Sequence, residues 1–102
     1  MSDFRQIGVE GVLSQIPDRG NAYVTIDCDA LDPSIAPGVT SPDHDGMTYR
    51  EMRMLLSGIA SRTKVVGFDF VELNPFFDQA GITQTAAVGI IKGFLGDIFD
   101  NK

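Results

Sequence analysis

Two aspartates stand two residues apart where an apolar run of the sequence ends. Asp27 and Asp29 close the first part of YVTIDCDALDPSIAPG, and a proline-rich loop follows them. Side chains at i and i+2 of a strand point to one face, so the two carboxylates are expected to converge. Such a pair is self-repelling, and a divalent cation that prefers oxygen ligands would offset the repulsion. The structural alternative is that these aspartates cap a helix or anchor a turn, and their spacing does not exclude it.

A third acid, Glu72, ends the apolar run KVVGFDFVEL. In open parallel α/β sheets, ligands bind outside the carboxyl ends of the strands. Three carboxylates are therefore expected at one edge of a sheet if the two runs are parallel neighbours. A calcium loop of the EF-hand type fits poorly, because Leu31 takes the next alternate position and Asp32 stands where the loop needs glycine.

The elements that must position these acids alternate between helix and strand. Thr48 and Glu51 have the spacing of a capping box, which predicts a helix start. The apolar periodicity predicts a helix over Ile7 to Ile16, a strand over Ala22 to Cys28, a loop over Ala30 to Met47, a helix over Tyr49 to Ala60, a strand over Lys64 to Leu73 and a helix over Thr83 to Phe99. A crossover this long requires parallel pairing, so the fold class is α/β, with one parallel β-α-β unit and flanking helices. Two strands make a poor sheet alone, which favours a piece of a larger domain or a chain that assembles with its own copies.

Charge and composition narrow the function further. The chain has 102 residues and a net charge of −6, and its eight basic residues are scattered, which argues against nucleic acid as a partner. No apolar run approaches the roughly 18 residues of a membrane span, so we expect a soluble protein with no membrane partner. The single cysteine, Cys28, and the lack of a signal-peptide pattern favour the cytoplasm. Within an apolar run, Cys28 is more typical of a packed hydrophobe than of a nucleophile.

Two long motifs give the chain a resemblance to a known family. The stretch TIDCDALDPSIAPGVTSPDHDG resembles the last signature of the ureohydrolases, which are the arginases, agmatinases and related guanidino amidinohydrolases. The matched positions are Thr25, Ile26, Asp27, Asp29, Pro33, Pro37, Gly38 and Gly46. The run VVGFDFVELNPFFD resembles the family's following strand with its glutamate-bearing end. The resemblance covers the chain from about Ile7 onward. It implies that residues 1–102 form a single, incomplete domain, the C-terminal part of a three-layer α/β/α arginase-like fold.

The resemblance also implies roles for these residues. Asp27 would bridge two manganese ions, Asp29 would bind one of them, and Glu72 would face the guanidinium of the substrate. Such enzymes hydrolyse a guanidino compound to urea and an amine, and their metals lower the pKa of a bound water. The motif favours an agmatine-like substrate. The segment VTSPDHDG departs from the family pattern, so His44 could help choose the substrate, or it could be an exposed loop histidine with no role.

The family's other metal ligands come from a Gly-Gly-Asp-His motif and an Asp-Ala-His-x-Asp motif, and neither occurs here. His44 is the only histidine, so the chain by itself cannot complete a dinuclear centre. We therefore expect a C-terminal portion that begins at an artificial or truncated Met1, is inactive alone, and has as partners the remaining N-terminal part, a guanidino substrate and further copies in a homo-oligomer. Two alternatives are a non-catalytic assembly half-domain and a simple carboxylate metal-binding domain.

Overall fold

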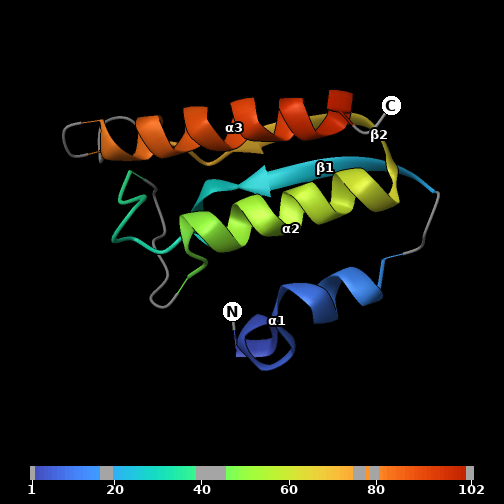
Figure 1. The fold of residues 1–102 in the computed structure, drawn as a ribbon. Coiled ribbons are helices and arrows are strands. Elements are labelled where there is room, and N and C mark those ends of the chain that lie inside the picture. Colours follow the sequence, from blue (N-terminus) through green and yellow to red (C-terminus); the bar gives the residue numbers. More distant parts are fainter. Residues whose placement is uncertain (1, 17–19, 39–45, 75–77, 79–80, 101–102) are drawn as a thin grey trace.

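The computed structural model describes residues 2–16, 20–38, 46–74, 78 and 81–100, with residues 2–7 described by their backbone only. The elements are α1 (Ser2–Ser14), β1 (Asn21–Asp27), the 3-10 helix η1 (Cys28–Ala30), α2 (Tyr49–Arg62), β2 (Lys64–Val71) and α3 (Ile82–Asp100) (Figure 1). The expected alternation of helix and strand is confirmed. The largest difference lies in α1, which begins earlier than expected and is kinked at Gly8, where φ is 70°.

The two strands form one parallel sheet. Asn21 lies opposite Lys64 and Asp27 lies opposite Val71, with a bulge between Ala22 and Tyr23. Helix α2 is the crossover between the strands, so the parallel β-α-β unit is confirmed. Because the strands run in the same direction and in register, their carboxyl ends lie together, at the end of the molecule where α2 and α3 begin (Figure 1).

Helix α2 begins at the capping box that the sequence predicts. The Thr48 hydroxyl accepts a hydrogen bond from the Glu51 N–H at 3.1 Å, and the Glu51 carboxylate accepts one from the Thr48 N–H at 2.9 Å. Both bonds satisfy amide groups that have no partner inside the helix. The cap therefore fixes where the loop after β1 ends and the crossover begins.

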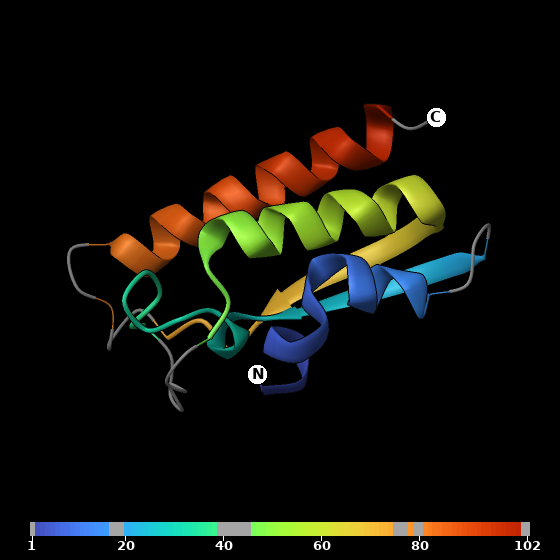
Figure 2. The same cartoon turned by 60° about the horizontal axis from the view of Figure 1, so that its bottom comes forward.

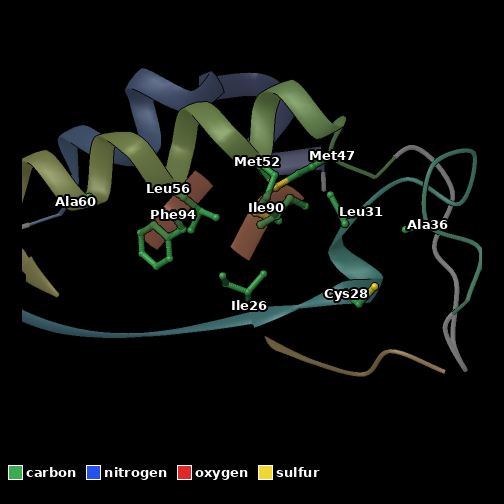
Figure 3. Close-up of a cluster of buried hydrophobic side chains, with 10 residues drawn as sticks. All are labelled: Ile26, Cys28, Leu31, Ala36, Met47, Met52, Leu56, Ala60, Ile90 and Phe94. Atoms are coloured by element: carbon green, nitrogen blue, oxygen red, sulfur yellow. The ribbon is translucent and has the colours of Figure 1, made fainter. Parts of the chain in front are cut away.

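Helices α2 and α3 cover the same face of the strand pair (Figure 2). The core between them and the sheet is built from buried apolar side chains of both layers (Figure 3), namely Ile26, Cys28, Leu31, Ala36, Met47, Met52, Leu56, Ala60, Ile90 and Phe94. Phe94 is fully buried and meets the ring of Phe68 edge to face, with ring centroids 5.0 Å apart. This contact ties α3 to β2.

Small residues on α3 let α2 pack closely against it. A Cβ at Gly93 would lie 2.1 Å from the Cζ of Arg53, and a Cβ at Gly89 would lie 2.6 Å from the hydroxyl of Tyr49. The Arg53 guanidinium also forms an ion pair with Asp97, at 3.2 Å. The glycines therefore make room for two long side chains of α2.

Helix α3 is the one helix of the described part that is long and apolar enough to cross a membrane by length and composition. That criterion is weak evidence, because core helices of soluble proteins also meet it. Four α3 side chains are buried inside the protein: Thr83, Ala87, Ile90 and Phe94. Its apolar composition is therefore accounted for in part by packing on the sheet.

The opposite face of the sheet carries no helix of the described residues (Figure 2). Tyr23 on β1 lies on this face and is 62% exposed. On this face the Tyr23 hydroxyl donates a hydrogen bond to Oδ2 of Asp69 at 3.1 Å, whereas Oδ1 of Asp69 is buried and has no partner among the described residues. Parallel sheets are almost always covered on both faces. The described chain is thus two layers of a fold that needs a third.

Candidate functional site

The end of β1 is shaped by a hydrogen bond between the two predicted site aspartates. Strand β1 ends at Asp27, and the next three residues form η1. Oδ1 of Asp27 accepts from the backbone N–H of Asp29 at 3.1 Å, so Asp27 is the N-cap of η1. The expectation that both side chains project from one strand face is therefore wrong in its geometry, because Asp29 lies in a 3-10 turn and not on the strand. Capping, the structural alternative, is present at Asp27.

Cys28, between the two aspartates, is buried and belongs to the core cluster (Figure 3). Burial, the largest cause, and the negative charges of Asp27, Asp29 and Asp78 together raise the pKa of its thiol to about 11. The thiol is thus a packed, protonated group.

Glu72 stands one residue beyond β2, next to Val71, the partner of Asp27 in the sheet. It is exposed, and its φ of 67° is the positive value that non-glycine residues rarely adopt. Such a conformation costs on the order of 1–3 kcal/mol and tends to occur at functional sites. The structure therefore brings Glu72 to the edge of the sheet where β1 ends, on a strained backbone.

The loop after β1 is closed at its base. Leu31 forms a parallel bridge with Met47, where the Asp32 N–H donates to the Met47 carbonyl and the Met47 N–H donates to the Ala30 carbonyl, both at 2.8 Å. The Asp32 carboxylate also accepts from the N–H of Gly46 at 3.2 Å. These bonds join the two described ends of the loop, residues 30–32 and 46–47, beside η1. His44, predicted to influence substrate choice, lies outside the described residues.

A second set of contacts joins this loop to the chain after β2. The Gly38 carbonyl accepts from the Asn74 N–H at 2.6 Å, and the Gly38 N–H donates to Oγ1 of Thr83 at 2.7 Å. The Asp78 carboxylate accepts from the N–H groups of Thr83 and Gln84, at 2.9 and 3.1 Å. Sequence reasoning gave Asp78 and Thr83 no role. The signals were an acid shortly before a helix and a hydroxyl residue in its first turn.

The donor types at the strand ends suit manganese, although the set is incomplete. Asp27 and Asp29 supply carboxylate oxygens, which are suitable ligands for a hard divalent ion. Among residues 8–16, 20–38, 46–74, 78 and 81–100, no three His, Cys, Asp or Glu side chains are grouped closely enough to hold a metal ion. Asp27 and Asp29 alone therefore do not make a complete metal site in the described part of the chain.

A surface hollow of about 350 Å³ lies near the start of α3, lined by Gly81, Gln84, Thr85 and Val88. Asp27, Asp29 and Glu72 do not line it. We assign it no function.

A two-layer unit with acids at the carboxyl ends of its parallel strands is typical of part of a larger open α/β domain. The model of the arginase family matches residues 1–96, and the chain belongs to that family. A guanidinopropionase from Pseudomonas aeruginosa is 39% identical over 92 residues, which are 87% of this chain and 28% of that protein.

Solved structures agree with this assignment. Proclavaminate amidino hydrolase from Streptomyces clavuligerus matches 99% of this chain with a TM-score of 0.85 and 32% identity, and the match covers 34% of that chain. The agmatine ureohydrolase of Thermoplasma volcanium matches 95% of this chain with a TM-score of 0.82 and 27% identity, over 32% of its own length. The chain thus spans about a third or less of each of these relatives. The family, the arginase-like fold and the fragment nature of the match are as the sequence motifs implied.

Proposed function

We propose that this chain supplies one part of the active site of a manganese-dependent amidinohydrolase, which hydrolyses an agmatine-like guanidino compound to urea and an amine. The observation that carries the proposal is the sheet register, with Asp27 opposite Val71 and Glu72 next in sequence. Membership in a family of guanidino hydrolases gives the chemistry.

Each acid has a distinct part in this proposal. Asp27 and Asp29 would hold manganese, with Asp27 shared between two ions. The hydrogen bond from Asp29 uses Oδ1 of Asp27, and the Asp27 carboxylate makes no other hydrogen bond among the described residues, so Oδ2 is available to a cation. When bound, the metal supplies a water of lowered pKa.

Glu72 would bind the substrate, because a carboxylate accepts paired N–H groups from a planar guanidinium. Its exposure leaves the side chain accessible to a ligand. The role of His44 in substrate choice stays a prediction. Its test is a His44→Ala variant, and an unchanged ranking of substrates would remove the idea.

The fragment alone is expected to be inactive, since it lacks the other ligands. The test compares urea release by residues 1–102 with release by an extended protein, in which a segment carrying the Gly-Gly-Asp-His and Asp-Ala-His-x-Asp motifs precedes this chain. The substrates are agmatine, arginine and guanidinobutyrate, each assayed with manganese.

The extended protein should release urea, and Asp27→Asn should abolish the release. Asp100→Asn is the matched control, because Asp100 ends α3 and is exposed. If the extended protein hydrolyses none of a broad guanidino panel, the proposed function is wrong.

The uncovered face of the sheet favours a second candidate, a non-catalytic half-domain that assembles with the remaining part of the fold or with its own copies. Tyr23, on that face, is a large side chain that the described part of the chain leaves 62% exposed. Analytical ultracentrifugation measures the mass of the assembly at each protein concentration. A mass that rises with concentration, together with no manganese binding in the extended protein, would favour assembly over catalysis.

A further inference from the structure

One backbone position joins the two loops that carry the predicted site acids. Gly38 belongs to the loop that follows Asp27 and Asp29, and it is buried. Its carbonyl accepts from the N–H of Asn74, two residues after Glu72, at 2.6 Å. Both polar backbone groups of Gly38 are thus used, because its N–H donates to Oγ1 of Thr83. We call Gly38, Asn74, Asp78 and Thr83 the clasp.

The clasp leaves no space for a side chain at Gly38. A Cβ there would lie 2.7 Å from Cβ of Asp78, 2.9 Å from Oγ1 of Thr83 and 3.1 Å from the carbonyl oxygen of Asn74. These neighbours are a backbone atom and atoms close to the backbone, which cannot swing aside as the end of a long side chain can. A methyl group would therefore push the segment after β2 away from the loop after β1.

Thr83 is itself held in place. Its side chain is 0% exposed, and its N–H donates to Oδ1 of Asp78 at 2.9 Å. The neighbouring N–H of Gln84 donates to the other oxygen of Asp78. The first turn of α3 thus presents one fixed acceptor to the Gly38 amide, and this amide would be buried without a partner if the hydroxyl were removed.

We propose that Gly38 and Thr83 are positioning residues, which set the separation between the Asp27–Asp29 turn and Glu72 through the clasp. The inference rests on the proposed function for its catalytic consequence. Neither residue touches the substrate or the metal in this account. They act by fixing where the guanidinium-binding carboxylate lies relative to the metal-binding pair.

The catalytic test uses the extended protein and four variants: Gly38→Ala, Thr83→Val, Thr83→Ser and, as a control, Gly20→Ala, since a Cβ at Gly20 would meet nothing within 4 Å. Displacing a positioned group by about 1 Å can cost on the order of 100-fold in rate. Gly38→Ala and Thr83→Val should lower kcat/KM by about that factor with unchanged manganese affinity. Thr83→Ser keeps the hydroxyl, so its kcat/KM should stay near that of the parent protein. The kcat/KM of Gly20→Ala should equal that of the parent.

A role in stability alone gives a different result. The variants would then melt at lower temperature yet keep kcat/KM at temperatures where they are folded, and that outcome overturns the proposal. Equal activity of Thr83→Val and Thr83→Ser overturns it as well.

Amide hydrogen exchange on residues 1–102 tests the hydrogen bonds of the clasp and does not depend on enzymatic activity. Thr83→Val should speed exchange at the Gly38 and Asn74 amides and leave the Asp29 amide unchanged, because the Asp29 amide bonds to Asp27 instead. Unchanged exchange at Gly38 overturns the clasp. If the extended parent protein releases no urea, the proposed function is wrong, and so is the catalytic role of the clasp. The exchange rates at Gly38 and Asn74 still show whether the clasp joins the two loops.

Discussion

Two substitutions at Asp27 separate its structural role from its predicted metal role. Asp27→Ala removes the acceptor of the Asp29 N–H, which is the N-cap of η1. Loss of such a cap costs about 0.5–2 kcal/mol, and a value near 1 kcal/mol is reasonable for so short a helix. For a domain of this size, about 1 kcal/mol lowers Tm by roughly 4–8 °C. Asp27→Asn keeps an oxygen of the same reach, and asparagine caps as well as aspartate does, so its Tm should stay near that of the parent.

Manganese binding should respond differently. Both variants remove the negative charge, so both should lose manganese affinity in the extended protein, although only Asp27→Ala should be less stable. Thermal unfolding followed by circular dichroism gives the stability, and calorimetric titration gives the affinity. If Asp27→Asn is as unstable as Asp27→Ala, the capping account is wrong, and if it binds manganese as the parent does, the metal role of Asp27 is wrong.

Three further predictions concern the scaffold. Phe94→Ala should lower the free energy of unfolding by about 3–5 kcal/mol, because the ring is fully buried against Phe68; urea denaturation that shows a loss below about 1 kcal/mol would contradict this packing. Gly93→Ala should change stability little, since the displaced guanidinium of Arg53 can swing aside and the gain in helix propensity of about 1 kcal/mol offsets the weakened ion pair; a large loss in the same assay would show that Arg53 is rigid. The pKa of Cys28 is raised from 9.0 to about 11, so unfolding releases its proton above pH 9.0, and stability should fall with rising pH between those values, less steeply in Cys28→Ala; equal slopes in the two proteins would contradict the raised pKa.

The order of elements and the parallel pairing could be predicted from the sequence because they depend on local patterns. The apolar run of β2, the helical spacing in α2 and the capping box at Thr48 each report on neighbours in the chain. The turn after Asp27 could not be predicted in the same way. Alternation along a strand assumes that the strand continues, whereas here the Asp27 side chain ends it by accepting from the Asp29 amide.

Contacts between segments distant in the chain could not be predicted from local sequence patterns either. Gly38 and Thr83 are 45 residues apart, and their hydrogen bond exists only once α3 is packed on the sheet. The pairing of Tyr23 with Asp69, 46 residues away, has the same origin, because it depends on the register of the two strands. The family motif includes Gly38 as a glycine. The structure gives the reason, which is the contact with Asp78, Thr83 and Asn74.

The proposed site is a dinuclear manganese site that includes Asp27 and Asp29, with Asp27 shared by both ions. Its most direct test is the number of manganese ions bound by the extended protein and by its Asp27→Asn, Asp29→Asn and Asp100→Asn variants. The account predicts that Asp27→Asn weakens binding of both ions, that Asp29→Asn weakens binding of one, and that Asp100→Asn binds as the parent does. Equal stoichiometry and affinity in all four proteins would contradict it.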